Sequence, residues 1–345
     1  MESPLNQWGE KATREMKVFV ALAALVFGAT CVSSGPSDGD LGGTTPGIGR
    51  FALGTKIDVL KAKTEMLEYL TEENCTIDDE LRVSEGLAVG EQFLLTVYGA
   101  TSKYGLVTIH SDYEDGTDND DIRMRLSGRQ RFDQSDAFDA YIDPWTALQG
   151  KTDSWLNDND QMGEFKQESS SSQTDMLIMA PHGGAIESYT DELAARFYDG
   201  LVTTNSKDAS LWYCIGHQDA IGAFDAWHIT STDINEANFG YLNDLSGRTY
   251  DYAVTVHGYS GSEVLVGGGA STSFKEDVKD ALDGISWSYT VTVVGEGDSY
   301  AGVHEDNIVN RYSSTGVQLE IPYSARRDYW EDIADALTDY YKTLI

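Results

Sequence analysis

Two histidines stand directly after apolar runs, and each is followed at once by glycine. His182 follows the segment DMLIMAP, which begins at Asp175, and His257 follows DYAVTV. A carboxylate, Glu187, comes five residues after His182. Two imidazoles and one carboxylate that leave a fourth position open form the donor set of a hydrolytic zinc site. A single histidine beside glycine is usually structural, so the metal-site hypothesis depends on the parallel placement of the two.

The elements that must position these side chains are indicated by the second half of the chain, where apolar runs alternate with amphipathic segments. The expected strands are 175–180, 211–216, 250–258, 287–295 and 316–322, and the expected helices are 191–200, 273–284 and 328–341. This alternation predicts an α/β fold with a mixed, mostly parallel sheet and helices on both faces. Ligands of such sheets bind beyond the carboxyl ends of the strands, so His182 and His257 are expected at one end of the sheet.

A second carboxylate, Glu320, lies inside the apolar segment GVQLEIP. Burying a carboxylate without a task is costly, because its charge loses hydration. Glu320 is therefore a candidate general base that takes a proton from the attacking water. The alternative is a structural ion pair with Arg326 or Arg327.

Candidates for substrate binding follow from two further segments. Asn310 and Arg311 occur in NIVNR, and a planar guanidinium suits a substrate carboxylate, although Arg311 fits an ordinary surface position equally well. His228, in WHIT, either polarises a carbonyl or binds substrate, or it is a core histidine with satisfied hydrogen bonds.

A serine nucleophile is a rival chemistry. The segment HGYSGS departs from the G-x-S-x-G nucleophile motif because Ser262 occupies the last glycine position. Ser260 would also need a partner histidine downstream, and His304 alone follows it in the sequence. The H-E-x-x-H motif of zinc peptidases does not occur in the sequence.

Composition restricts the partners. The chain has 57 acidic and 24 basic residues, which gives a net charge of −33. Such a charge excludes nucleic acid as an expected partner, since no basic patch with interleaved aromatic residues is present in the sequence. With 41% hydrophobic and 11% aromatic residues the chain is not expected to be disordered. An acid excess on a folded surface predicts a halophilic protein, because high salt screens self-repulsion.

The first 50 residues are expected to be a leader and a linker. Residues 18–29, VFVALAALVFGA, have the length of a signal-peptide core and are short for a membrane span. Cleavage, acylation of Cys31 and retention as a membrane anchor all remain open, so the expected location is secreted or cell-surface. The composition of residues 33–47 is that of a linker.

Residues 51–165 are expected to form a small, mostly β domain ahead of an α/β hydrolase domain at 174–345. Strand-like content at 91–99, 104–113 and 121–132 predicts an antiparallel unit, and the pattern over 56–70 predicts an amphipathic helix. A polar stretch at 167–173 separates the two halves.

The order of the motifs resembles the phage-type poly-γ-glutamate hydrolase family, relatives of the zinc carboxypeptidases. The motifs are PHGG followed by IE, then HITST, HG-x-SG, NIVNR and GVQLEIP, and they extend over about half the chain, from Asp175 to Ile345. The resemblance implies a zinc cofactor and cleavage of γ-glutamyl amide bonds in a polyanionic poly-γ-glutamate substrate.

The resemblance also implies roles for residues at matching positions. His182, Glu187 and His257 are expected to bind zinc, and Glu320 is expected to act as the general base. The residues at the substrate-binding positions are Asn310, Arg311 and His228.

Two other classes of function remain open from the sequence. A carboxypeptidase-like enzyme or an N-acyl amino acid deacylase has the same metal site but acts on a small substrate. A non-catalytic surface protein stabilised by zinc would use Glu320 as an ion-pair partner.

Overall fold

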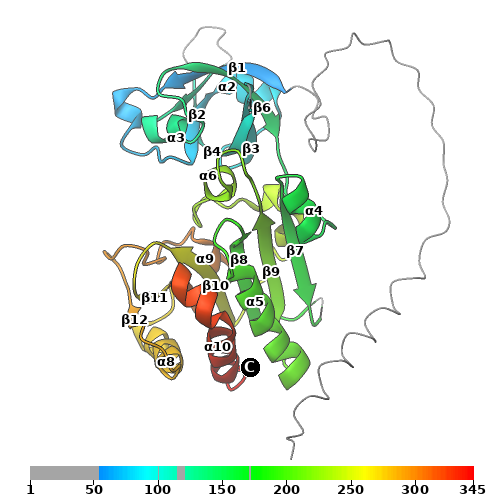
Figure 1. Cartoon of the computed structure of the whole chain (residues 1–345), viewed down its shortest axis with the longest axis vertical. Coiled ribbons are helices and arrows are strands. Elements are labelled where there is room, and N and C mark those ends of the chain that lie inside the picture. Colours follow the sequence, from blue (N-terminus) through cyan, green and yellow to red (C-terminus); the bar gives the residue numbers. More distant parts are fainter. Residues whose placement is uncertain (1–53, 100, 115–120, 171) are drawn as a thin grey trace, which may run out of the picture. The chain divides into compact units, whose positions relative to one another are not determined.

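The computed structural model describes residues 54–99, 101–114, 121–170 and 172–345, which fall within one compact unit, Gly47–Ile345 (Figure 1). The expected leader, Cys31 and the linker lie outside the described residues. Within the described part of the chain, no helix is both long enough and apolar enough to cross a membrane.

The β unit predicted ahead of the sheet is present, and its described strands close into a barrel with the order β1-β5-β2-β4-β3-β6 (Figure 1). The strands are β1 Thr55–Lys61, β2 Asn74–Asp78, β3 Gln92–Val97, β4 Lys103–Tyr113, β5 Asp121–Met124 and β6 Phe138–Pro144. Its short helices are η1 Thr64–Met66, α2 Asp79–Ser84 and α3 Leu126–Gln130, and α4 Asp153–Asp158 follows the barrel. The pairs β1–β5 and β2–β4 are parallel, so the unit is not purely antiparallel as expected.

The helix predicted over residues 56–70 is wrong, because strand β1 occupies its first part. Ile57 and Val59 are buried in the barrel while their neighbours Lys56 and Asp58 are exposed. This alternation with a period of two places the β-branched residues inside the barrel, and it outweighs the weaker helical periodicity of the longer window.

The remaining described strands form a seven-stranded sheet, in the order β12-β11-β13-β10-β8-β9-β7 (Figure 1). Its strands are β7 Met162–Glu168, β8 Met176–Gly184, β9 Ser210–Gly216, β10 Tyr252–Tyr259, β11 Val264–Gly267, β12 Val291–Val293 and β13 Gly316–Pro322. The central strands β13, β10, β8 and β9 are mutually parallel, whereas β7 and β11 run antiparallel to their inner neighbours. The predicted mixed, mostly parallel sheet is confirmed.

Helices cover both faces of this sheet, as the sequence predicted. On one face, α5 Thr190–Asp199, α8 Thr272–Asp283 and α10 Tyr323–Tyr341 pack against alternate residues of the central strands. The π-helical turn η2 Gly200–Thr204 continues α5. On the other face lie the shorter elements α6 Ala223–Trp227, η3 Glu236–Asn238, α7 Gly240–Asn243 and α9 Ile308–Tyr312. A connecting segment, residues 228–235, joins α6 to η3 on that second face.

The register of the central strands brings the candidate residues together. Strands β10 and β13 are parallel neighbours in which His257 and Glu320 are directly paired, so both side chains point to the same face. Strand β8 carries one extra residue relative to β9 between Ala180 and Gly183. This bulge reverses the side-chain alternation and turns His182 away from the face that Met176 and Ile178 bury, toward the face of His257.

Candidate metal centre

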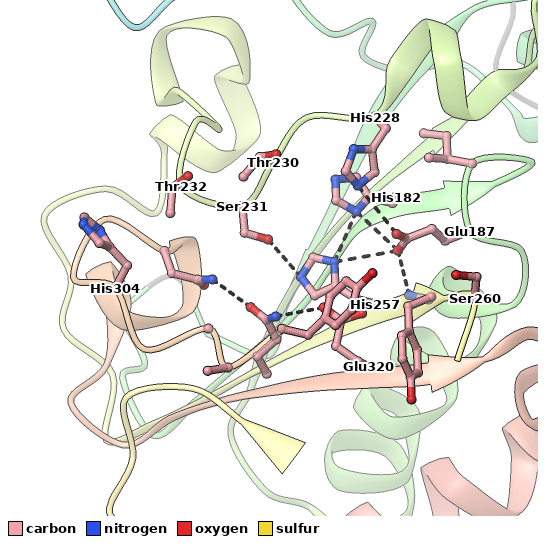
Figure 2. Close-up of a pocket in the computed structure, with 18 of the residues that line it drawn as sticks. His182, Glu187, His228, Thr230, Ser231, Thr232, His257, Ser260, His304 and Glu320 are labelled. Carbon is pink, nitrogen blue, oxygen red and sulfur yellow. Dashed lines mark hydrogen bonds and ion pairs between the residues drawn. The ribbon is translucent and has the colours of Figure 1, made fainter. Parts of the chain in front are cut away.

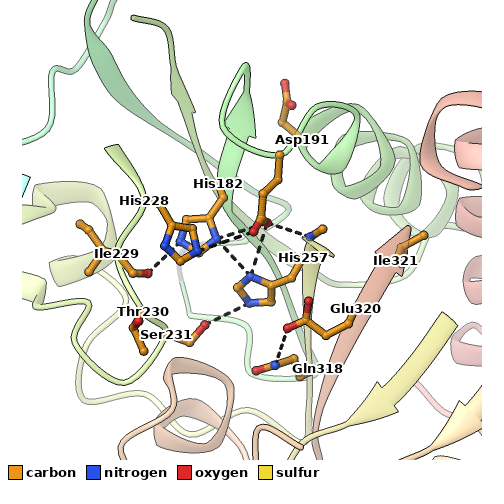
Figure 3. A network of polar contacts seen from close by, with 12 residues as sticks. His182, Asp191, His228, Ile229, Thr230, Ser231, His257, Gln318, Glu320 and Ile321 are labelled. Atoms are coloured by element: carbon orange, nitrogen blue, oxygen red, sulfur yellow. Dashed lines mark hydrogen bonds and ion pairs between the residues drawn. The ribbon is translucent and has the colours of Figure 1, made fainter. Parts of the chain in front are cut away.

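The two ring nitrogens of His182 face different groups: Nε2 faces the backbone at Ile229, and Nδ1 faces His257 (Figure 3). Its Nε2 lies 2.9 Å from the carbonyl oxygen of Ile229. A carbonyl only accepts hydrogen bonds, so Nε2 carries the proton and Nδ1 keeps a lone pair. Gly183, the next residue, has no space for a side chain, because an added Cβ would lie 2.5 Å from the Cβ of Asp191 on α5.

His257 is arranged in the same way. Its Nε2 lies 3.2 Å from the hydroxyl of Ser231, which can accept the ring proton, and its Nδ1 lies 3.1 Å from Nδ1 of His182. In both imidazoles a hydrogen-bonding partner at Nε2 fixes the ring, and the two Nδ1 atoms face each other. Partners of this kind orient metal-binding histidines.

Glu187 completes the cluster from the turn that precedes α5. Its backbone nitrogen donates to the carbonyl oxygen of His182 at 2.8 Å, which bends the chain back after the PHGG motif. Its Oε2 accepts a hydrogen bond from the backbone nitrogen of Gly258 at 2.8 Å. An added Cβ at Gly258 would lie 1.7 Å from Nη1 of Arg326, so the glycine after His257 makes room for a buried guanidinium.

The three donor atoms lie at separations that suit one small cation (Figure 2). Oε2 of Glu187 is 3.3 Å from Nδ1 of His182 and 3.7 Å from Nδ1 of His257. Ligands about 2.0 to 2.2 Å from a tetrahedral zinc ion are roughly 3.3 Å apart. A looser group of His182, Glu187 and His228 has donor atoms within 4.8 Å of one another. The shorter separations favour the set that contains His257.

The electrostatics of this cluster agree with a cation-binding role. Burial lowers the pKa of His182 to about 4, so its imidazole is neutral and able to donate a lone pair at neutral pH. Burial by itself favours protonated Glu187, but the adjacent His182 and His257 hold its pKa well below the ordinary value. Two imidazole nitrogens and one carboxylate oxygen are a donor set that fits Zn²⁺.

Glu320 lies beside this cluster on β13 and is 6% exposed. Burial raises its pKa to about 7. Its Oε1 accepts a hydrogen bond from Nε2 of Gln318 at 2.8 Å (Figure 3). Oε1 of Gln318 accepts in turn from Asn307 at 2.7 Å. This chain of amides fixes the carboxylate in place.

The arginines proposed as structural partners of Glu320 have other contacts. Arg326 donates from Nε to the carbonyl of Ser188 at 2.8 Å and from Nη1 to the carbonyl of Ile321. Arg327 is paired with Asp328 on the surface. Among the described residues, no ion pair joins either arginine to Glu320.

A cavity of about 880 Å³ opens over these side chains (Figure 2). The chemically important residues of its lining are His182, Glu187, His228, His257, Glu320 and Arg326. Ser260 and His304 also line it but lie on opposite sides, and no hydrogen bond joins them among the described contacts (Figure 2). The geometry therefore gives no support to a serine nucleophile.

His228 lies against the cluster, at the rim of the cavity. Its ring stacks on Phe224 with centroids 4.3 Å apart, and its Nε2 lies 3.6 Å from Oε1 of Glu187. Nδ1 is bonded to Glu73 of the barrel. Burial lowers the pKa of His228, but the bond to Glu73 outweighs this effect and the net shift is upward.

Asn310 and Arg311, the residues predicted to bind substrate, lie away from this cavity. Asn310 accepts from the backbone of Gly269 and donates to the carbonyls of Gly302 and His304, so it braces two loops. Arg311 pairs with Glu236 at 3.1 Å and lines a separate cavity of about 270 Å³.

Three residues at the site were not singled out from the sequence. Gln318 stands two positions before Glu320 on a strand, which places both on one face, so its role was readable from the alternation of β13. Ser231 stands inside the quoted motif HITST. Glu73 carries no such signal, because it is 155 residues from His228 and belongs to another element.

Comparison with known proteins identifies the family of the chain. Residues 153–342, more than half of the chain, match the model of the family described as Poly-gamma-glutamate hydrolase. A protein of Bacillus subtilis (strain 168), the SPbeta prophage-derived YoqZ, is 34% identical over 157 residues. That alignment covers 44% of this chain and 51% of YoqZ, so the chain spans about half the length of this curated relative.

Two solved structures are also similar. One, described as the zinc-free form of YndL, is 21% identical with a TM-score of 0.42, and the match covers 56% of this chain and 93% of that one. The other, described as a bacteriophage poly-gamma-glutamate hydrolase, is 26% identical with a TM-score of 0.40 and coverages of 51% and 87%. Both TM-scores lie below 0.5, so the assignment to a family rests on the match to the family model.

Proposed function

This chain belongs to the poly-gamma-glutamate hydrolase family, and we propose that it is a zinc-dependent hydrolase of γ-glutamyl amide bonds. The observation that carries the proposal is the convergence of three donor atoms, on His182, Glu187 and His257, within 3.1 to 3.7 Å of one another beside buried Glu320. A structural zinc site would need neither an adjacent carboxylate with a raised pKa nor an open cavity.

The proposed ligands are Nδ1 of His182, Oε2 of Glu187 and Nδ1 of His257. When bound, zinc polarises a scissile carbonyl and lowers the pKa of water to about 7. Ile229 and Ser231 hold the two imidazoles in the orientation that this role requires.

Glu320 is the proposed general base. A pKa of about 7 leaves a substantial fraction of the carboxylate ionised at neutral pH, so Glu320 can take a proton from the attacking water. It then returns that proton to the leaving amine as the carbon–nitrogen bond breaks. Gln318 keeps the carboxylate directed at the cavity during both transfers.

His228 and Arg326 are the proposed substrate contacts. His228 lines the cavity, and its raised pKa favours an imidazolium that can donate toward a carbonyl oxygen carrying negative charge. Arg326 lines the same cavity, and among the described residues no hydrogen-bond acceptor is found for its Nη2. A γ-linked glutamate unit carries a free α-carboxylate, which suits this guanidinium. The contacts of Arg311 make it the weaker candidate for this role.

The test is a comparison of two polymers under the same conditions. Purified protein with zinc is expected to cleave γ-linked polyglutamate and to leave α-linked polyglutamate intact, with activity lost to a chelator and restored by Zn²⁺. The sizes of the products then separate internal cleavage from release of terminal units. Equal cleavage of both polymers, or γ-polymer cleavage that survives complete zinc removal, would contradict the proposal.

A further inference from the structure

A short segment between α6 and η3 orients all the imidazoles of the candidate metal centre. Within residues 228–231, the carbonyl of Ile229 holds His182 and the hydroxyl of Ser231 holds His257 (Figure 3). The ring of His228 lies against that of His182, with centroids 4.2 Å apart. The positions of both proposed imidazole ligands therefore depend on residues 228–231, which we call the clamp segment.

The clamp segment is neither helix nor strand, so no ladder of backbone hydrogen bonds holds it. The ring of His228 and two groups of Thr230 are bonded instead to Glu73 of the barrel, which is 7% exposed. The carbonyl of Ser231 accepts from the backbone nitrogen of Ile308 at 3.0 Å. Oε2 of Glu73 accepts from the backbone nitrogen and the hydroxyl of Thr230 at 2.7 and 2.9 Å, and Oε1 is bonded to Nδ1 of His228. The backbone carbonyl of Glu73 accepts from the backbone nitrogen of Thr108 in β4 at 2.9 Å, so the residue is fixed to the barrel.

The flanks of the clamp segment are bonded to the barrel as well. Before it, the carbonyl of Asp225 in α6 accepts from Nε of buried Arg131 at 2.8 Å. After it, Asn238 in η3 exchanges two hydrogen bonds with the backbone of Gln92, at 2.9 and 2.8 Å. Barrel residues are therefore bonded to the clamp segment itself and to the helices that precede and follow it.

We propose that Glu73 is a positioning residue of the metal centre and that the barrel supplies part of the support that zinc binding requires. The inference rests on the proposed function, since it concerns the same site. Glu73 touches no reacting atom. It acts through His228 and Thr230, which set the positions of Ile229 and Ser231, and these two residues orient the proposed zinc ligands.

The test is zinc affinity in full-length Glu73→Gln, measured by competition with a chromogenic chelator. Loss of a direct hydrogen-bonding partner of a metal ligand weakens affinity about 10- to 100-fold. Glu73 acts one contact further out, so the expected result is a weakening near the lower end of this range, about tenfold. Glu72→Gln is the matched control, because Glu72 is exposed and adjacent in sequence, and it should retain wild-type affinity. Thr230→Val removes one bond from the segment side and should weaken affinity by a smaller factor.

A second measurement separates this inference from the proposed function. In metal-free wild type, the Nε2 proton of His182 should give a slowly exchanging imidazole signal by NMR, because Ile229 holds it. That signal should persist in Glu72→Gln and disappear in folded Glu73→Gln. If wild type binds no zinc, the proposed function fails and the imidazole signal still decides the role of Glu73. Wild-type zinc affinity together with an intact signal in folded Glu73→Gln, and unchanged affinity in Thr230→Val, would overturn the inference.

Discussion

Glu164 and Glu320 are two buried carboxylates on the same sheet, and their surroundings differ sharply. Glu164, on the edge strand β7, is 1% exposed and accepts four hydrogen bonds. These come from Gln149 at 2.8 Å, Trp212 at 3.0 Å, and the backbone nitrogens of Tyr241 at 2.8 Å and Leu242 at 3.3 Å. Its charge is fully solvated by the protein, as expected of a carboxylate that organises structure.

Glu320 lies on the central strand β13 and has one hydrogen-bond donor among the described residues, Gln318. It faces a cavity, and burial raises its pKa to about 7. Burial of a carboxylate therefore does not by itself indicate function. The informative difference is how many donors the fold provides, since a group left short of donors is able to exchange a proton.

The largest expected effect is on turnover in Glu320→Gln. Removal of a general base typically lowers kcat about 10²- to 10⁴-fold, and glutamine retains an oxygen that can accept from Gln318. We therefore expect kcat on γ-linked polyglutamate to fall about 10³-fold while zinc content stays at the wild-type level. Retention of wild-type turnover would remove Glu320 from the mechanism.

The opposite outcome is expected for Glu164→Gln. Each oxygen of Glu164 accepts two hydrogen bonds. In either orientation of the glutamine amide, its NH₂ group would therefore face two N–H donors and lose both bonds. The free energy of unfolding should fall by about 2 to 3 kcal/mol, measured by urea denaturation. The kcat of the folded fraction should be within about twofold of wild type, because the residue touches no part of the cavity. A large loss of kcat without loss of stability would contradict this distinction.

A third prediction concerns the stability of the metal-free protein as a function of pH. The pKa of Glu320 is raised from 4.5 to about 7, so the folded state binds more protons than the unfolded state between these values. The contribution of Glu320 to stability is therefore greatest below about pH 4.5 and declines as the pH rises through 7.

Glu320→Gln lacks this titration. Its stability relative to wild type should rise by about 2 to 3 kcal/mol between pH 4.5 and pH 7.5, measured by urea denaturation of chelator-treated protein. Two stability curves that stay parallel over this range would show that Glu320 has an ordinary pKa in the metal-free fold.

The smallest predicted effect separates two arginines. Arg326→Lys keeps the charge but loses the planar fork, so KM for γ-linked polyglutamate should rise about tenfold with little change in kcat. Arg311→Lys is the matched control and should change KM less than about twofold, because Arg311 lies in another cavity. A larger effect on KM in Arg311→Lys than in Arg326→Lys would indicate that Arg311 binds the substrate carboxylate, as the sequence predicts.

The α/β sheet could be predicted from the sequence because its central strands are continuous apolar runs. His182 and His257 stand at the ends of such runs and Glu320 stands inside one, and the rule for parallel sheets places the carboxyl ends of strands together. The bulge that turns His182 toward the site was not predictable, since it depends on pairing between β8 and β9.

The barrel was less predictable because its strands are short and two of its pairs are parallel, which sequence alternation does not reveal. The role proposed for Glu73 depends on contacts between residues more than 150 positions apart, and no local pattern indicates them. The substrate-binding role of Asn310 and Arg311 stays a prediction from their residue types. Their residue types suit substrate binding, but α9 directs them to loops and to Glu236.

The most direct test of the central claim is zinc content, by elemental analysis of wild type and His257→Ala purified without chelator. We predict about one zinc ion per chain in wild type and a clear loss in the folded variant, because Nδ1 of His257 is one of three donor atoms. Wild-type zinc content in His257→Ala, or folded wild type that takes up no zinc, would contradict the metal centre and the hydrolase function proposed from it.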